Sequence, residues 1–246
     1  MKYGVQLYSV RDAVEAIGMK ETLRRVAKIG YKSVEFAGFG DASAEEVRDM
    51  LKELGLSVDG THTGIKALLP DTIEATVKDM QTIGNKRVII PSARLKTDAD
   101  IEIFLQQVAY AMPILKSACI ELGFHNHHTE FLPNEDGTVP MDVLKERTDL
   151  FFELDTYWAY HAGIDPIEEM ERMGGRLKMI HIKDGVGGDT KTCGRPLGLG
   201  TAPVGAVYQK ARALGLPMVV ESETLQPDGM TEISVCYDHL IQLEKQ

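Results

Sequence analysis

Residues 121–131 read ELGFHNHHTEF, a short apolar segment followed by three histidines and one asparagine in four consecutive positions. The pattern predicts a buried strand whose last residues are polar. Side chains alternate along a strand, so His125 and His127 share one face of it. The fold therefore depends on whether other strands of the chain end in the same way.

Short apolar or β-branched runs recur along the whole chain, and each is a predicted strand. The predicted strands cover residues 3–9, 33–38, 56–62, 87–92, 122–127, 150–156, 177–183 and 217–223. Intervening segments such as 19–30 and 44–55 carry apolar residues at helical spacing. Strand–helix units roughly thirty residues apart predict an α/β fold in which residues 1–246 form a single (β/α)8 barrel domain. An open doubly wound sheet is the alternative, but YSVRDA follows the first strand where that fold would have a Gly-rich phosphate-binding turn.

Glycine and aspartate mark the predicted helix boundaries. Helices commonly end at glycine, and the candidates are Gly30, Gly55, Gly84, Gly123, Gly174 and Gly215. Capping side chains and a first-turn proline predict helix starts, and the candidates are Asp41 or Ser43, Asp71, Asp98, Asp165-Pro166 and Thr201-Ala202-Pro203.

Composition restricts the class of partner. The chain is 43% hydrophobic with a net charge of −10, and its lysines and arginines form no basic stripe, so we expect no nucleic-acid partner. Cys119, Cys193 and Cys236 form no CxxC motif, which suits a reducing compartment. The N-terminus lacks the long apolar region of a signal peptide, and no run reaches membrane-spanning length. We expect a cytoplasmic protein without a membrane partner; a homo-oligomer stays open.

Polar residues gather where the predicted strands end, which is where barrels build their active sites. These residues are Glu35, His62, His125, His127, Asp155, His181, Lys183, Glu221 and Glu223. One such residue is most often a cap or a hydrogen-bonded structural side chain. On five or more strands that explanation weakens, because each uncompensated buried charge costs several kcal/mol. Converging carboxylates also repel unless a cation lies among them. Imidazole and carboxylate together suit a divalent metal, with Mn, Zn, Co, Fe and Mg all candidates.

Five blocks of sequence resemble a known family: GFHNHHTEF, ELDTYWAYHAG, MIHIKD, GLGTAPV and VVESE. The chain resembles the xylose isomerase-like TIM barrels, the sugar phosphate isomerase/epimerase group, over nearly its whole length. That group includes ketose 3-epimerases, inosose dehydratases and isomerases, hydroxypyruvate isomerases and endonuclease IV-type DNA-repair enzymes. The blocks are specific for the superfamily and weakly specific for one reaction.

The resemblance implies a set of metal ligands. Family members hold the metal with Glu on strand five, Asp on strand six, His on strand seven and Glu on strand eight. Asp155, His181 and Glu221 match the last three positions. The strand-five position departs from the pattern, because His125 stands where many relatives have Glu. We expect His125 as the fourth ligand, with His127 and Glu130 as the other candidates.

The resemblance also implies the chemistry. We expect a metal-dependent isomerase or epimerase, or secondly a dehydratase (a lyase), acting on a keto-sugar, inosose or related polyol through an enediolate. Glu221 or Glu35 would take the carbon-bound proton, and His62 or His125 would return it or help to expel a hydroxyl.

His127 and Glu130 are also candidates for binding the substrate, and three further residues have a functional and a structural interpretation. Lys183 either neutralises a developing oxyanion or pairs with Asp155 or Glu153. Trp158 stands where many relatives have His, and it is either one wall of a sugar pocket or a packed aromatic. Gln6 either hydrogen-bonds a sugar hydroxyl or makes an internal barrel contact.

Two other functions remain as alternatives. One is a non-catalytic sugar- or polyol-binding protein on the same barrel. The other, less favoured because the chain is acidic, is an endonuclease IV-like DNA-repair enzyme. The Gly-rich segment GLGTAPV (198–204) is a weak candidate for holding an anion or hydroxyl groups at the start of a helix.

Overall fold

Eight parallel strands close into a barrel in the computed structural model, which describes residues 2–246. Around the barrel the order is β1-β10-β7-β6-β5-β4-β3-β2. The strands are β1 (Gly4–Gln6), β2 (Ser33–Phe36), β3 (Ser57–His62), β4 (Arg87–Ile90), β5 (Glu121–His125), β6 (Phe151–Asp155), β7 (Leu177–Ile182) and β10 (Met218–Val220). The predicted (β/α)8 barrel is confirmed. A short antiparallel pair, β8 (Asp184–Gly185) and β9 (Gly194–Arg195), follows β7 outside the barrel.

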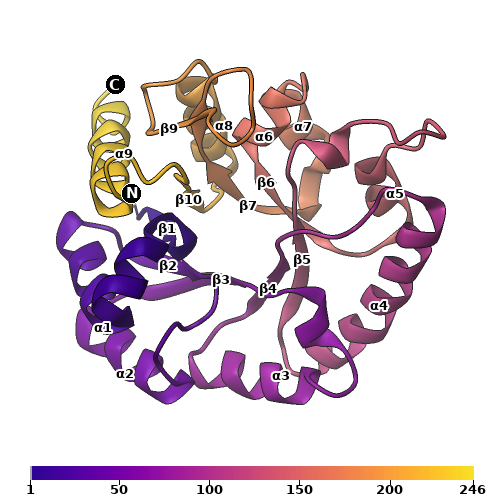
Figure 1. The fold of residues 1–246 in the computed structure, drawn as a ribbon, viewed down its shortest axis with the longest axis horizontal. Coiled ribbons are helices and arrows are strands. Elements are labelled where there is room, and N and C mark those ends of the chain that lie inside the picture. The colour runs from indigo at the N-terminus through magenta and orange to yellow at the C-terminus, as the bar shows by residue number, and fades with distance from the viewer. Residues whose placement is uncertain (1) are drawn as a thin grey trace.

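Helices form a ring outside the strands (Figure 1). They are α1 (Arg11–Ile29), α2 (Ala44–Leu54), α3 (Ile73–Thr82), α4 (Asp98–Ser117), α5 (Pro140–Arg147), α6 (Thr156–His161), α7 (Pro166–Met173), α8 (Val204–Leu214) and α9 (Gly229–Glu244). Single 3-10 turns follow three of the strands, η1 (Leu7–Val10), η2 (Ile65–Leu68) and η3 (Thr129–Phe131), and a fourth, η4 (Gly174–Arg176), joins α7 to β7. Within residues 2–246, no helix combines the length and apolarity needed to cross a bilayer.

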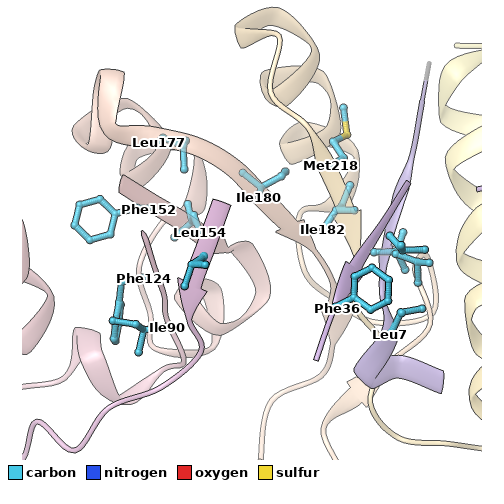
Figure 2. Packing of buried hydrophobic residues seen from close by; sticks show 14 of the residues in the cluster. Leu7, Phe36, Ile90, Phe124, Phe152, Leu154, Leu177, Ile180, Ile182 and Met218 are labelled. Atoms are coloured by element: carbon cyan, nitrogen blue, oxygen red, sulfur yellow. The ribbon is translucent and has the colours of Figure 1, made fainter. Parts of the chain in front are cut away.

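Alternation along the strands divides the apolar side chains into two sets. One set points outward and packs under the helices, and Figure 2 shows Phe36, Phe124, Phe152 and Ile182 among its members. A separate cluster of inward-facing apolar side chains lies inside the barrel, and it contains Ile89, Phe151, Met179 and Val219. The outer set joins the helices to the barrel, and the inner set forms an apolar floor under the polar strand ends.

Local capping agrees with most of the predicted helix boundaries. Ser43 forms a capping box with Glu46 at the start of α2, and Asp165 caps α7 with proline in its first turn. Gly55 and Gly215 end α2 and α8 in the left-handed region. Helix α8 begins directly after Pro203, as predicted.

Two predicted boundaries were wrong, whereas α4 begins at Asp98 as predicted, with Thr97 as its N-cap. Thr72, rather than Asp71, is the N-cap residue of α3. Gly123 does not end a helix but lies inside β5. A β-carbon at Gly123 would lie 2.3 Å from the Phe151 ring, so the missing side chain makes room for the inner apolar cluster.

Candidate metal centre

A cavity of about 400 Å³ opens at the carboxyl ends of the strands. Four predicted site residues line it: His62, His125, His127 and Glu221. The rest of its wall consists of Glu223, one of the predicted strand-end residues, and of four residues that sequence reasoning did not single out: Tyr8, Ala37, Pro91 and Ser92. Ala37, Pro91 and Ser92 directly follow β2 and β4, so the strand-end rule would have found them had it not been limited to ionisable residues.

Four of the predicted ligands meet at the floor of this cavity. His125, Asp155, His181 and Glu221 each offer one ligand atom, and these atoms all lie within 4.8 Å of one another. All four residues are buried. Nε2 of His125 is 3.7 Å from Oδ2 of Asp155, and Nδ1 of His181 is 3.3 Å from Oε2 of Glu221. The group could hold a divalent cation, since two imidazoles with two carboxylates suit Mn, Fe, Co or Zn.

The orientation of His125 leaves one ring nitrogen without a partner. Nδ1 lies 3.3 Å from the carbonyl oxygen of Pro91, which can only accept, so Nδ1 carries the proton. Nε2 is then a lone-pair acceptor. Among the described residues, neither Nε2 of His125 nor Oδ2 of Asp155 has a hydrogen-bond partner, although both are buried. Two facing, unsatisfied electron-pair donors fit a cation between them.

Asn126 explains the centre of the HNHH sequence. Its side-chain oxygen accepts a hydrogen bond from the Asp155 backbone N–H at 3.0 Å, and its amide donates to the Asp155 carbonyl at 3.2 Å. The Asp155 side chain also caps α6, since Oδ1 accepts from the Trp158 N–H at 2.9 Å. These bonds hold Asp155 with its second oxygen, Oδ2, left for the centre of the site.

Lys183 lies beside the centre and is ion-paired within it. Its Nζ is 3.0 Å from Glu221 Oε2 and 3.6 Å from Asp155 Oδ2, and it also pairs with Glu223. Burial opposes the charge on the ammonium group, but the carboxylates outweigh it and raise the pKa of Lys183. Burial likewise opposes the charge on Glu221, yet Lys183 and His181 hold the pKa of Glu221 well below its usual range.

A second polar group lies deeper, between the cavity and the inner apolar cluster. Nε2 of His62 is 2.8 Å from Glu153 Oε2, and Nε2 of His181 is 2.6 Å from Glu35 Oε2. Gln6 donates to the same Glu35 oxygen at 2.7 Å. Glu35 and Glu153 are both fully buried, so Glu35 lies beneath the cavity rather than in its wall. Sequence reasoning did not place Glu153 in the site.

The charges in this deeper group are strongly coupled. Burial and the nearby Glu153 raise the pKa of Glu35. Burial acts the same way on Glu153, but His181 and His62 outweigh it and lower the Glu153 pKa. Burial disfavours the charged form of His62, yet Glu35 and Glu153 raise its pKa overall.

Three predicted substrate-binding residues do not line the cavity. Gln6 makes the internal contact that was its other interpretation, since its amide bonds Glu35 and the Tyr8 N–H. Trp158 is buried against His127 and His128, with ring centroids 6.0 and 5.4 Å apart. Glu130 is also buried, and its Oε2 accepts from the His127 N–H at 2.9 Å.

His127 does line the cavity, and the loop around Glu130 holds it there. Burial and the neighbouring His125 lower the pKa of His127 to about 4. At neutral pH its imidazole is therefore uncharged, which suits hydrogen bonding to hydroxyl groups.

The Gly-rich segment 198–204 already holds an anion, the side chain of Asp184. Oδ2 of Asp184 accepts from the N–H groups of Gly198 and Gly200, both at 2.9 Å. Oδ1 accepts from Gly185 at 2.8 Å and from Ala202 at 3.1 Å. A β-carbon at Gly200 would lie 2.1 Å from Oδ1, so this close approach requires glycine. The anion expected at this segment belongs to the chain itself.

Comparison with known proteins agrees with the barrel. The family model described as "Xylose isomerase-like TIM barrel" matches residues 23–235. A solved sugar phosphate isomerase/epimerase from Parabacteroides distasonis is 24% identical, with 98% of each chain covered and a TM-score of 0.84.

Two more distant structures share the fold. The probable 3-DHS dehydratase of Bacillus anthracis is 13% identical over 98% of this chain and 99% of its own, with a TM-score of 0.77. An L-ribulose 3-epimerase is 16% identical over 100% and 95%, with a TM-score of 0.71. No curated protein matches the sequence.

Proposed function

Since the chain belongs to the xylose isomerase-like TIM barrel family, we propose that it is a divalent-metal-dependent enzyme acting on a keto-sugar, inosose or related polyol. Isomerisation or epimerisation is the first reaction to test, and dehydration the second. The observation that carries the proposal is the group His125, Asp155, His181 and Glu221 at the floor of an open cavity, in which two buried ligand atoms have no hydrogen-bond partner within residues 2–246.

The cavity presents proton-transfer groups of opposite character. Glu221 is held ionised by Lys183 and His181 and is suited to accept a carbon-bound proton. His62 has a raised pKa through Glu35 and Glu153 and is suited to donate one. When bound, a divalent cation would act as a Lewis acid that polarises a substrate carbonyl and its neighbouring hydroxyl.

His125 and Lys183 complete the proposed assignment. With its Nδ1 proton held by Pro91, His125 would use Nε2 as a ligand rather than as a general base. Lys183 balances the charge of Glu221 and Asp155, so it is also placed to neutralise negative charge developing at the centre. His127, uncharged and in the cavity wall, would bind hydroxyl groups of the substrate.

Solvent isotope exchange tests the proposal. The protein, purified and loaded in turn with Mn, Co, Zn, Fe or Mg, is incubated in D2O with a panel of keto-sugars and inososes. We expect deuterium to enter the carbon next to the carbonyl, or water to be lost, and NMR with mass spectrometry distinguishes the two. Bound metal with neither outcome across the panel would favour the non-catalytic binding protein.

Substitution tests the centre itself. We expect Asp155→Ala and His181→Ala to lose metal and exchange activity while remaining folded by circular dichroism. Asp149→Ala is the matched control, because Asp149 is exposed and precedes the opposite end of the same strand. Folded variants that retain a full equivalent of metal would overturn these ligand assignments. Incision of abasic-site DNA by the loaded protein would instead favour the DNA-repair alternative.

A further inference from the structure

His181 separates two groups of carboxylates and presents one ring nitrogen to each. Nδ1 faces the proposed metal centre, 3.3 Å from Glu221 Oε2. Nε2 faces the interior of the barrel, 2.6 Å from Glu35 Oε2 and 3.2 Å from Glu153 Oε1. An imidazole that binds a cation through one nitrogen must carry its proton on the other, so the partner of Nε2 decides whether Nδ1 is free to act as a ligand.

Of the two interior carboxylates, Glu35 is the hydrogen-bond partner of His181. Glu153 is engaged by His62 at 2.8 Å, and its Oε1 has no hydrogen-bond partner among residues 2–246 despite lying near His181. The Glu35 contact is shorter and meets hydrogen-bond geometry. His181 and Glu35 are both fully buried, so water does not compete for this contact.

The side chain of Gln6 fixes the direction of this bond. Its Oε1 accepts the Tyr8 backbone N–H at 3.0 Å, which identifies the other amide atom as the NH2 group. That NH2 group donates to Glu35 Oε2 at 2.7 Å. The oxygen that faces His181 therefore already acts as a hydrogen-bond acceptor. Nε2 of His181, at 2.6 Å, is placed as its second donor.

We propose that Glu35, oriented by Gln6, is a positioning residue that accepts the Nε2 proton of His181 and so directs the Nδ1 lone pair at the metal centre. This role rests on the proposed function and replaces the direct proton abstraction expected of Glu35. Carboxylate–histidine–metal arrangements of this kind fix the ring and increase the basicity of the ligand. Losing such a partner lowers metal affinity about 10- to 100-fold.

Zinc affinity of two matched variants tests the role. Glu35→Gln and Glu153→Gln each remove one buried negative charge beside His181 with little change of shape, but only the first replaces the carboxylate bonded to Nε2 by a weaker, neutral amide acceptor. We expect the zinc Kd, measured by chelator competition, to rise about 10- to 100-fold in Glu35→Gln and clearly less in Glu153→Gln. Equal affinities in the two folded variants, or tighter binding by Glu35→Gln, would overturn the inference.

The protonation of the His181 ring can also be measured on the wild-type protein, which avoids relying on a variant that folds. In the zinc-loaded protein labelled with 15N-histidine, we expect His181 to show a protonated Nε2 and a zinc-bound Nδ1. A zinc-bound Nε2, or a proton on Nδ1, would refute the role of Glu35 while leaving metal binding intact. Failure of the wild-type protein to bind any divalent metal would instead refute the proposed function, so the two failures are distinguishable.

Discussion

At the scale of single residues, alternation along a strand predicted which side chains face the barrel interior but not how deep each one lies. Glu153 and Asp155 are two residues apart in β6, and both face inward. On β6 only Asp155, the last residue of the strand, was expected in the site. Glu153 was therefore missed, although alternation along the strand also places the residue two positions before Asp155 on the inner face.

Depth depends on how neighbouring strands are staggered, which no single strand reveals. Glu35 was expected in the cavity but pairs with Gly60, and the register between β2 and β3 shifts at Val34/Glu35. Strand tilt and stagger in a barrel place equivalent strand ends at different heights. The identities of the inward residues could therefore be predicted from sequence, while their separation into a cavity wall and a buried layer could not.

Asp59 gives a pH-dependent prediction at this scale. Burial raises its pKa to about 6, with Glu35 adding to the rise and the Ser33 hydroxyl opposing it. The folded state then holds a proton that the unfolded state releases at lower pH. The stability contributed by that proton is fully present below the ordinary carboxyl pKa and is lost as the pH rises through about 6.

Asp59→Asn should remove this loss, because the amide has no charge to bury. We expect its free energy of unfolding to exceed that of the wild type by about 1–2 kcal/mol at about pH 8 and to match it at about pH 3.5. The range allows for the partial exposure of the side chain. Urea unfolding across this pH range measures the difference, and parallel pH profiles for the two proteins would contradict the assignment.

At the scale of elements, the positions of strands were predicted better than their lengths. The first strand was expected over residues 3–9, yet β1 ends at Gln6 and a 3-10 turn takes residues 7–10. The eighth was expected over 217–223, yet β10 covers only Met218–Val220. Hydrogen bonds to neighbouring strands determine where a strand ends, and those partners lie far away in sequence.

The loop after β7 illustrates the same limit and yields a prediction. Its glycines indicated an anion site, but the anion, Asp184, lies 14 to 18 residues before three of its four donors. Asp184→Ala leaves those N–H groups without their acceptor, so we expect the free energy of unfolding to fall by about 2–4 kcal/mol. Amide hydrogen exchange at Gly198, Gly200 and Ala202 should accelerate.

Asp189→Ala is the control for the Asp184 prediction. Asp189 lies in the same loop after β7 and accepts a hydrogen bond from the Lys191 N–H, but its side chain is exposed. Its loss should change the free energy of unfolding by less than about 0.5 kcal/mol. If both variants exchange amides at the wild-type rate, Asp184 does not organise the loop.

At the scale of the whole molecule, the first and last strands close the barrel. β1 pairs with β10 through Gly4–Val219 and Val5–Val220, and the Tyr31 hydroxyl donates to the Ile233 carbonyl of α9. In Figure 1 the C-terminal helix α9 accordingly lies beside the N-terminal elements. Disrupting either end opens the barrel, which is the physical reason to expect residues 1–246 to behave as one domain.

Metal addition tests this expectation together with the site, since the proposed ligands come from four different strand ends. We expect a single calorimetric transition that moves up by about 5–10 °C when free metal exceeds its Kd about 100-fold. The shift should vanish in Asp155→Ala, because the centre is then incomplete. Two separate transitions in the wild-type protein would contradict a single domain.

The carboxylate of Asp184 has a consequence for the choice of substrate. A phosphorylated sugar approaching the Gly-rich loop would meet a tethered group of its own charge, already holding the amide donors that a phosphate would need. Displacing it would mean competing with an acceptor that never diffuses away. For the proposed sugar substrate, discrimination between phosphorylated and unphosphorylated forms would therefore fall to the cavity, where Glu221 and Glu223 already share the one ammonium group of Lys183.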